Sequence, residues 1–192
     1  MAGIGGPLAF LDASALYPAL LRNILMRCAM MDLFSARWSE QIQVEWTRSV
    51  LRDRPNLSRA AIERTRRQMD ENINDATVIG YGHLIESVVL PDPDDRHVLA
   101  AAIHCGASVI VTANLRDFPA SVLSAHRIEP QHPDAFLLSL IAREPDQVRV
   151  ALRQLRLAFN NPPMTGDDIL AAMEKQGLRA SAEALAALGD PL

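Results

Sequence analysis

The sequence predicts an α/β fold with a central parallel sheet and a C-terminal extension made of helices alone. Short apolar runs at residues 8–11 and 108–112 have the length of buried strands, and segments with helical periodicity separate them. A strand, a helix and a strand joined by short turns imply a right-handed crossover and hence a parallel sheet. From His132 onward the pattern is helical only. We therefore expect a main domain over residues 1–140 and a helical extension over residues 141–192.

The first third of the chain reads as one strand followed by helices. Asp12 stands directly after the first apolar run. The predicted helices of this region are residues 13–31, interrupted by Pro18, residues 39–51, opened by Ser39, and residues 59–72, preceded by Ser58 as the N-cap. The third of these helices is strongly charged, so we expect it to be exposed on most of its surface.

The middle of the chain predicts the strand–helix–strand unit of the sheet. The run at residues 84–90 reads as a strand that enters a Pro-Asp-Pro turn. Asp94 is well suited to N-cap the following helix, which we expect over residues 95–105 with Gly106 as its C-terminal stop. The second apolar run follows as a buried strand. A small strand near residues 127–129 should complete the sheet.

Helical periodicity alone marks the last part of the chain. The predicted helices are residues 133–143, 145–159, 165–176 and 181–188. Residues 160–163, Asn-Asn-Pro-Pro, break the pattern. Thr165 with Asp168 three residues later resembles a capping box at the start of the third helix.

Composition bounds the class of protein. A chain of 192 residues with 49% hydrophobic residues and a net charge of -4 is typical of a folded globule. The apolar runs are far shorter than the ~20 residues that cross a bilayer. Because no basic leader precedes a hydrophobic segment either, we expect a cytoplasmic protein with no membrane partner. Cys28 and Cys105 lack CxxC spacing and are expected to be reduced and buried.

Positive charge is concentrated in residues 22–67, which hold ten arginines against five acidic residues, a local balance of +5. Such a segment can bind phosphates around an acidic pocket. It can equally be a solvated helix face in a chain that prefers arginine, since Lys175 is its only lysine. The sequence leaves both interpretations open.

Acidic residues follow the predicted strands where a parallel sheet gathers its ends. Asp12 ends the first apolar run, and Asp94 and Asp95 open the alanine-rich helix. Asn114 and Asp117 follow the next strand. Carboxylates gathered at such an edge repel one another unless a cation neutralises them. Because Mg²⁺ prefers hard oxygen ligands and makes its bound water more acidic, the pattern predicts a metal site for phosphodiester chemistry.

Four features together resemble a PIN domain, and more narrowly the bacterial PIN proteins counted among VapC-type toxins. They are Asp12 after an apolar strand, Glu45 on an early helix, Asp95 at the start of an alanine-rich helix, and the Thr-x-Asn-x-x-Asp-Phe turn at residues 112–118. The resemblance covers about residues 8–130. It implies a three-layer α/β/α fold with a central parallel sheet and a magnesium- or manganese-dependent nuclease that acts on RNA. The helical tail resembles the C-terminal extension of one branch of these proteins.

The resemblance also implies roles for the candidate site residues. The implied catalytic acids are Asp12, Glu45, Asp95 and Asp117, and all but Glu45 are also the implied metal ligands. The groups expected to contact the substrate or to support the ligands are Asp94, Ser14, Thr112 and Asn114. Two choices stay open, because Glu40 is a rival of Glu45 and Asp94 is a rival of Asp95. Taken singly, each of these acids can instead be a helix cap or a solvated side chain.

Other enzymes that place acids at strand ends fit the sequence less well. A receiver domain needs a lysine late in the sheet, and the only lysine, Lys175, lies in the tail. Haloacid-dehalogenase-type phosphatases need Asp-x-Asp after the first strand, and Ser14 stands at the second position. The five histidines show no shared ligand spacing, and we expect His97, close to the site, to lie on a helix surface.

The predicted function is hydrolysis of RNA phosphodiester bonds, in tRNA or mRNA, by an endoribonuclease that depends on Mg²⁺ or Mn²⁺. The resemblance implies products with a 5′-phosphate and a 3′-hydroxyl. It further implies the toxin of a type II toxin–antitoxin pair, a small antitoxin that blocks the acidic pocket, and a homodimer. Two alternatives stay open: a non-catalytic PIN-fold module that binds RNA or protein, and a housekeeping nuclease with no antitoxin.

Overall fold

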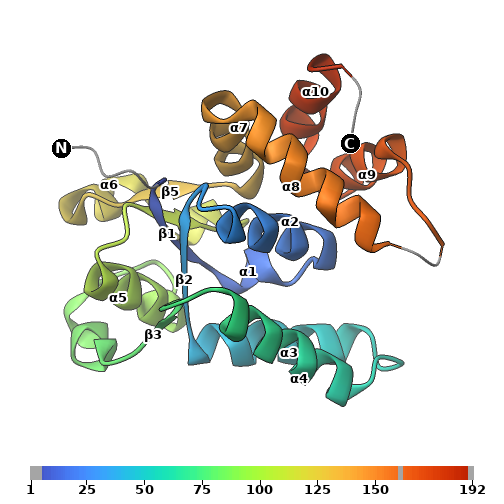
Figure 1. Ribbon diagram of the computed structural model, residues 1–192. Coiled ribbons are helices and arrows are strands. Elements are labelled where there is room, and N and C mark those ends of the chain that lie inside the picture. The colour runs from blue at the N-terminus through green and yellow to red at the C-terminus, as the bar shows by residue number, and fades with distance from the viewer. Residues whose placement is uncertain (1–5, 160–161, 190–192) are drawn as a thin grey trace.

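The computed structural model describes residues 6–159 and 162–189. They form an α/β fold with a five-stranded parallel sheet and a C-terminal helical region (Figure 1), which confirms the predicted fold class. The strands are β1 (Leu8–Leu11), β2 (Ser35–Ser39), β3 (Thr77–Val78), β4 (Val109–Val111) and β5 (Glu129–Gln131). Their order across the sheet is β3-β2-β1-β4-β5, and the pairings are parallel throughout.

Helices connect these strands. They are α1 (Ala13–Leu16), α2 (Ala19–Met30), α3 (Glu40–Asp53), α4 (Arg59–Asn72), α5 (Arg96–Cys105) and α6 (Ala120–Leu123). Four 3₁₀ segments lie between them: η1 (Tyr81–Ser87), η2 (Pro93–Asp95), η3 (Leu115–Asp117) and η4 (Ser124–His126). The helix predicted over residues 13–31 is split at Pro18, which has no N–H to continue α1 and stands at the N-cap of α2.

The strand order places α2 and α5 on opposite faces of the sheet. The chain moves outward from β1 to β2 and β3, then returns across β1 to reach β4 on the other side. Because crossovers between parallel strands are right-handed, helices that travel in the two directions cover different faces. Figure 1 shows α2 and α5 on different sides of the strands. Every strand then ends at one edge of the sheet, which we call the carboxyl edge.

Two strands escape prediction, and one predicted strand is wrong. β2 has the sequence Ser-Ala-Arg-Trp-Ser and β3 has only two residues, so neither carries an apolar run. The strand predicted at residues 84–90 instead falls largely in η1, which follows Gly80. Of that run only Val88 and Leu90 are buried, while Val89 is 70% exposed. These two buried side chains pack into the core, although their segment pairs with no strand of the described sheet.

The structure confirms the predicted N-cap positions of α3 and α4, which are Ser39 and Ser58. Ser39 accepts a hydrogen bond from the N–H of Ile42 (3.3 Å), which is the expected N-cap contact of α3. Ser58 stands at the N-cap of α4, although its side chain makes no capping bond within the part of the chain that the structure describes. The exposed character predicted for α4 is confirmed, since Ile62 and Met69 are its buried residues.

The C-terminal region consists of helices that pack beside α2 (Figure 1). They are α7 (Pro133–Arg143), α8 (Pro145–Ala158), α9 (Gly166–Lys175) and α10 (Arg179–Ala187). Phe136 of α7 meets Phe34, just before β2, edge to face with ring centroids 4.9 Å apart. Gln176, at the end of α9, accepts the N–H of Leu21 in the first turn of α2 (3.3 Å). Apolar and polar contacts thus fix the tail on the α/β region.

Two local predictions for the tail can be checked. Thr165 and Asp168 form the expected capping box, with hydrogen bonds in both directions. The predicted break at residues 160–163 includes Asn160 and Asn161, which lie outside the described residues. The boundary expected at residue 140 remains a prediction. None of the helices in the described ranges combines the length and apolar character that a bilayer span requires.

Candidate metal centre

The carboxyl edge of the sheet brings Asp12 and Thr112 together. β1 and β4 pair up to their last residues, so the next residue of each strand leaves the sheet at the same level. The N–H of Asp12 donates to the carbonyl of Val111 (3.1 Å). The hydroxyl of Thr112 donates to Oδ2 of Asp12 (2.8 Å). The register of the sheet alone therefore explains this contact between distant parts of the chain.

Asp12 is also held from its own loop. Its Oδ1 accepts the N–H of Ala13 (2.7 Å), and its Oδ2 accepts the hydroxyl of Ser14 (2.6 Å). The Ser14 hydroxyl in turn accepts the N–H of Ala113 (2.9 Å), which joins the loops that follow β1 and β4. Asp12 is 6% exposed, and neutral donors fix its carboxylate in one orientation.

Three further aspartates meet beside this edge. One carboxylate oxygen from each of Asp92, Asp95 and Asp117 lies within 4.8 Å of the others. Burial and the charges of Asp12, Asp92 and Asp117 raise the pKa of Asp95 to about 6, an effect that nearby His97 partly opposes. Asp12 is joined to this trio by hydrogen bonds that run through Thr112 and Asn114 to Asp117. The structure thus brings together three of the predicted acids, Asp12, Asp95 and Asp117.

Asp92 is a member of the cluster that sequence reasoning missed. It stands at the N-cap of η2 and accepts the N–H of Asp94 (2.9 Å). The Pro-Asp-Pro sequence was the available signal, since proline favours the first turn of a helix and aspartate the position before it.

The cap predicted at Asp94 is wrong. Asp94 is exposed, and Asp95 occupies the N-cap position of α5. The reason is that η2 begins at Pro93, two residues before the predicted helix, so the capping side chain is that of Asp92. Within the described chain, the Asp95 side chain makes no capping bond, which leaves its carboxylate to the cluster.

Asp117 lies in η3, and Asn114 holds it in place. The side-chain amide of Asn114 donates to Oδ2 of Asp117, and the Asn114 N–H donates to the hydroxyl of Thr112 (3.0 Å). Arg116 has its Nε 3.8 Å from Oδ1 of Asp117, but its side chain is 87% exposed. The side chains of Thr112 and Asn114 each donate to a carboxylate, so both residues support the acids.

Glu45 reaches the site through His97. Its Oε1 lies 3.0 Å from Nε2 of His97 and 3.1 Å from Nε2 of Gln41. His97 is on α5 two residues after Asp95, and it is 4% exposed. The prediction that His97 lies on a helix surface is wrong, because all six residues of α5 from 97 to 102 are buried.

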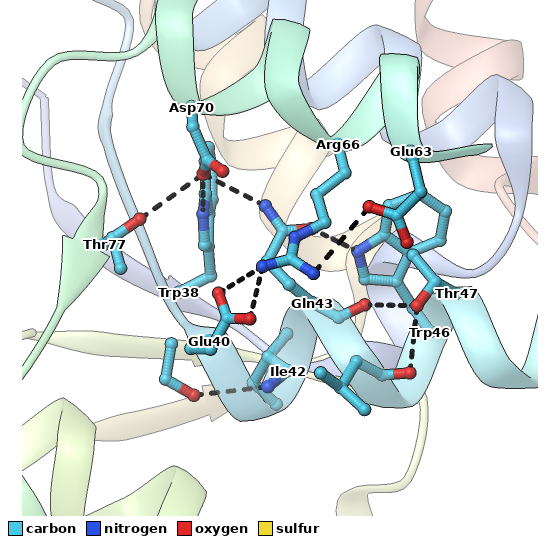
Figure 2. A network of polar contacts seen from close by, with 12 residues as sticks. Trp38, Glu40, Ile42, Gln43, Trp46, Thr47, Glu63, Arg66, Asp70 and Thr77 are labelled. Atoms are coloured by element: carbon cyan, nitrogen blue, oxygen red, sulfur yellow. Dashed lines mark hydrogen bonds and ion pairs between the residues drawn. The ribbon is translucent and has the colours of Figure 1, made fainter. Parts of the chain in front are cut away.

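The rival of Glu45 points elsewhere. Glu40 pairs with Arg66 of α4, and its side chain is 62% exposed. Figure 2 shows this pair at the contact between α3 and α4, with Glu63 on the other side of the Arg66 guanidinium. The structure thus places Glu45, rather than Glu40, against the helix that Asp95 precedes.

The helix that carries Glu45 is anchored by a polar network that runs from buried side chains to the exposed Asp70 (Figure 2). The indole N–H of Trp46 donates to Oε1 of Gln43 (2.7 Å), and the amide of Gln43 donates to Oδ1 of Asp70 (3.1 Å). The same oxygen accepts the indole N–H of Trp38 (2.9 Å) and the hydroxyl of Thr77 (3.3 Å). Because neighbouring helical side chains project about 100° apart, fixing Trp46 inward sets the direction of Glu45.

The arginine-rich segment serves in part as structure. Arg22 is 6% exposed, donates to the carbonyl of Leu16 (2.6 Å) and lies over the ring of Trp46, 4.4 Å from its centroid. Burial lowers the pKa of its guanidinium to about 10. Arg48, Arg64 and Arg67 are exposed, so phosphate binding by this segment remains a prediction.

The donor set of the aspartate cluster fits a hard divalent cation. It offers carboxylate oxygens only, which suit Mg²⁺ and Mn²⁺ rather than softer metals. Burial first, and then the charges of the neighbouring aspartates, raise the pKa of Asp95, so the ionised carboxylate is disfavoured there when no cation is bound. A bound cation would favour the ionised form of Asp95 against both effects. The chemistry of the residues is thus consistent with a metal site and leaves the identity of the ion open.

Comparisons with known proteins agree with this geometry. A family model described as PIN domain matches residues 9–116, and a model described as VapC50 C-terminal domain matches residues 133–187. A curated relative, "Putative ribonuclease VapC50" of Mycobacterium tuberculosis (strain ATCC 25618 / H37Rv), is 36% identical over 109 residues, which are 57% of this chain and 64% of that protein. No solved structure matches the chain. The chain therefore belongs to the PIN domain family and carries a VapC50 C-terminal domain.

Proposed function

We propose that this protein is a metal-dependent endoribonuclease that hydrolyses phosphodiester bonds in RNA. The observation that carries the proposal is the convergence of Asp12, Asp92 and Asp117 on the half-buried carboxyl group of Asp95. Such crowding is unfavourable in the absence of a cation and favourable in its presence. The name of the Mycobacterium tuberculosis relative, a ribonuclease, supports the choice of RNA as substrate.

Each residue of the site has a role in this proposal. Asp12, Asp95 and Asp117 hold the ion, and Asp92 adds a fourth carboxylate. Mg²⁺ or Mn²⁺, when bound, supplies positive charge for the scissile phosphate and lowers the pKa of water. Glu45 orients the attacking water and accepts its proton. Water adds to phosphorus, the bond from phosphorus to O3′ breaks, and O3′ takes a proton from solvent, which leaves the 5′-phosphate and 3′-hydroxyl that the family resemblance implies. The residues that keep the ligands in place are Ser14, Thr112 and Asn114.

We extend the proposal to a toxin–antitoxin pair. The VapC50 C-terminal domain and the VapC50 relative support a toxin that cleaves tRNA or mRNA in the cytoplasm and forms a homodimer. A small antitoxin would block the acidic cluster, with an arginine as the natural partner for its carboxylates. Expression of this chain alone should then arrest growth, and coexpression of the neighbouring small reading frame should restore it. Growth unaffected by an active enzyme would favour a housekeeping nuclease.

RNA cleavage by matched variants tests the nuclease. With Mn²⁺ and structured RNA, we expect cleavage by the wild-type protein and at least ~100-fold less by Asp12→Asn, beyond the 10–100-fold typical of supporting residues. Asp75→Asn is the control, because Asp75 is exposed in a turn with φ of 57°, which asparagine tolerates. Equal cleavage by wild type and Asp12→Asn would contradict the proposal. A failure of the wild-type protein to cleave any RNA with any divalent metal would favour a binding module.

A further inference from the structure

We propose that His97 is a positioning residue that holds the carboxylate of Glu45 in place for RNA hydrolysis, an inference that rests on the function proposed above. His97 is 4% exposed, and its Nε2 lies 3.0 Å from Oε1 of Glu45. The contact joins α5, which Asp95 precedes, to α3, which carries Glu45. His97 therefore sets the distance between the acidic cluster and the proposed proton acceptor.

The surroundings of His97 argue against a role in packing alone. Buried histidines normally satisfy both ring nitrogens. Among the residues that the structure describes, Nδ1 of His97 is buried and has no hydrogen-bond partner, so its polar contact is the one that Nε2 makes with Glu45. A buried nitrogen without a hydrogen-bond partner destabilises the folded protein. An apolar side chain of similar size would pack there without that cost, which points to a use for the ring at the carboxylate.

Glu45 needs such support because it lies on a partly exposed helix face. Its side chain is 34% exposed, and a glutamate that nothing else holds loses rotamer entropy when it is fixed in one conformation. Gln41, one turn earlier on α3, donates to the same Oε1 (3.1 Å). Two donors from two helices therefore fix Oε1, and Oε2 takes part in neither contact. The geometry assigns Oε2 as the oxygen that orients the attacking water.

Two amide substitutions at His97 separate the effect of its contact with Glu45 from the effect of burying a polar side chain. In His97→Gln the amide nitrogen falls close to the position of histidine Nε2, whereas in His97→Asn it reaches only the position of Nδ1. Both variants bury a neutral amide, so their effects on folding should be similar. In Mn²⁺-dependent cleavage of bulk tRNA by the full chain, we expect His97→Asn to lower kcat about 10–100-fold with KM little changed, and His97→Gln to restore most of kcat.

A double mutant tests whether His97 acts through Glu45. In a Glu45→Ala background the carboxylate is absent, so His97→Asn should lower kcat no further. An additional 10–100-fold loss in that background would show an independent role and overturn the proposal. Equal losses in His97→Asn and His97→Gln at unchanged thermal stability would overturn it as well.

A spectroscopic measurement tests the contact without activity, and it remains valid if substitutions at His97 unfold the protein. In protein labelled with ¹⁵N-histidine, we expect the Nε2–H of His97 to exchange slowly with water, and to shift and exchange faster in Glu45→Ala. His132 is the internal control, since its Nδ1 accepts the N–H of Asp134 (3.2 Å), away from Glu45. A His97 signal that Glu45→Ala leaves unchanged would overturn the proposal. An affected signal in a protein that cleaves no RNA would contradict the proposed function instead.

Discussion

Asp12 and Asp95 lie in the same acidic site but are held in opposite ways. Asp12 follows β1, is almost fully buried and accepts hydrogen bonds from one backbone N–H and two hydroxyls. Asp95 precedes α5, is half-buried beside three carboxylates, and has a pKa raised to about 6. On the β1–β4 side of the site, protein donors therefore satisfy the carboxylate. The α5 side becomes electrostatically favourable only when positive charge is added.

Replacement of Asp95 should have the largest effect, because it removes a ligand from the side that depends on the ion. We expect Asp95→Asn to reduce RNA cleavage by more than ~100-fold while the protein stays folded. The measurement is the initial rate of cleavage at saturating Mn²⁺, with Asp75→Asn as the control of equal charge change. Activity close to wild type in Asp95→Asn would remove Asp95 from the catalytic set.

Thr112→Val should damage the side that hydrogen bonds complete. Thr112 is fully buried and near in shape to valine, so the substitution removes the donor to Asp12 and the acceptor of the Asn114 N–H. We expect a loss of about 1–3 kcal/mol in the free energy of unfolding and a 10–100-fold loss of activity. Denaturant unfolding and cleavage rates measure both.

The control for this prediction is Thr65→Val. The Thr65 hydroxyl bonds only within α4, to the carbonyl of Ala61 (3.2 Å), among the contacts that the structure describes. We expect a change within about 0.5 kcal/mol. Equal destabilisation by the two threonine variants would show that the hydroxyl of Thr112 has no special role at Asp12.

The stability of the metal-free protein should depend on pH through Asp95. The pKa of Asp95 is about 6 in the folded protein against an ordinary value of 3.8. The folded state therefore keeps a proton that the unfolded chain has released, so the stability of the metal-free protein should fall as the pH rises from about 4 to about 7. After a discount for solvent exposure, we expect a loss of about 1–2 kcal/mol that Asp95→Asn lacks. Identical pH profiles for wild type and Asp95→Asn would contradict this electrostatic view.

Asp134 is an aspartate held by backbone N–H groups in the C-terminal region. Its replacement should have the smallest effect on RNA cleavage. Its carboxylate accepts the N–H groups of Ala180 (3.0 Å) and Ser181 (2.8 Å) at the start of α10, and Asp134 is not a member of the described acidic cluster. We expect Asp134→Ala to cost about 1 kcal/mol of stability, as the loss of a helix cap does. RNA cleavage at a temperature where the variant is folded should be unchanged. A large loss of activity would tie the tail to the chemistry.

The sequence predicts those parts of the fold whose signals are local. β1 and β4 are short apolar runs, and the helix starts at Ser39 and Ser58 follow from the residue types that favour N-caps. β2 and β3 lack such a signal, because their place in the sheet depends on pairing with strands distant along the chain. The run at residues 84–90 has the apolar signal without the pairing partner.

The candidate site shows the same division. Asp12, Asp95 and Asp117 stand directly at strand and helix ends, so the topology of a parallel sheet is enough to bring them together. The position of Asp92 depends on η2 beginning one turn before α5, which the pattern does not show. The burial of His97 depends on what surrounds α5 on every side, and this is a property of the assembled fold.

Thermal unfolding under a metal titration tests most directly the claim that the α5 side of the site requires a cation. At a metal concentration 100 times Kd, binding to the native state adds about 2.7 kcal/mol, which raises Tm by about 5–10 °C for a chain of this size. We predict this rise for the wild-type protein with Mn²⁺ or Mg²⁺, and for Asp95→Asn a higher metal-free Tm at pH 7 with little further rise. A wild-type Tm that does not respond to either metal, or a metal-free Asp95→Asn less stable than wild type, would contradict the account.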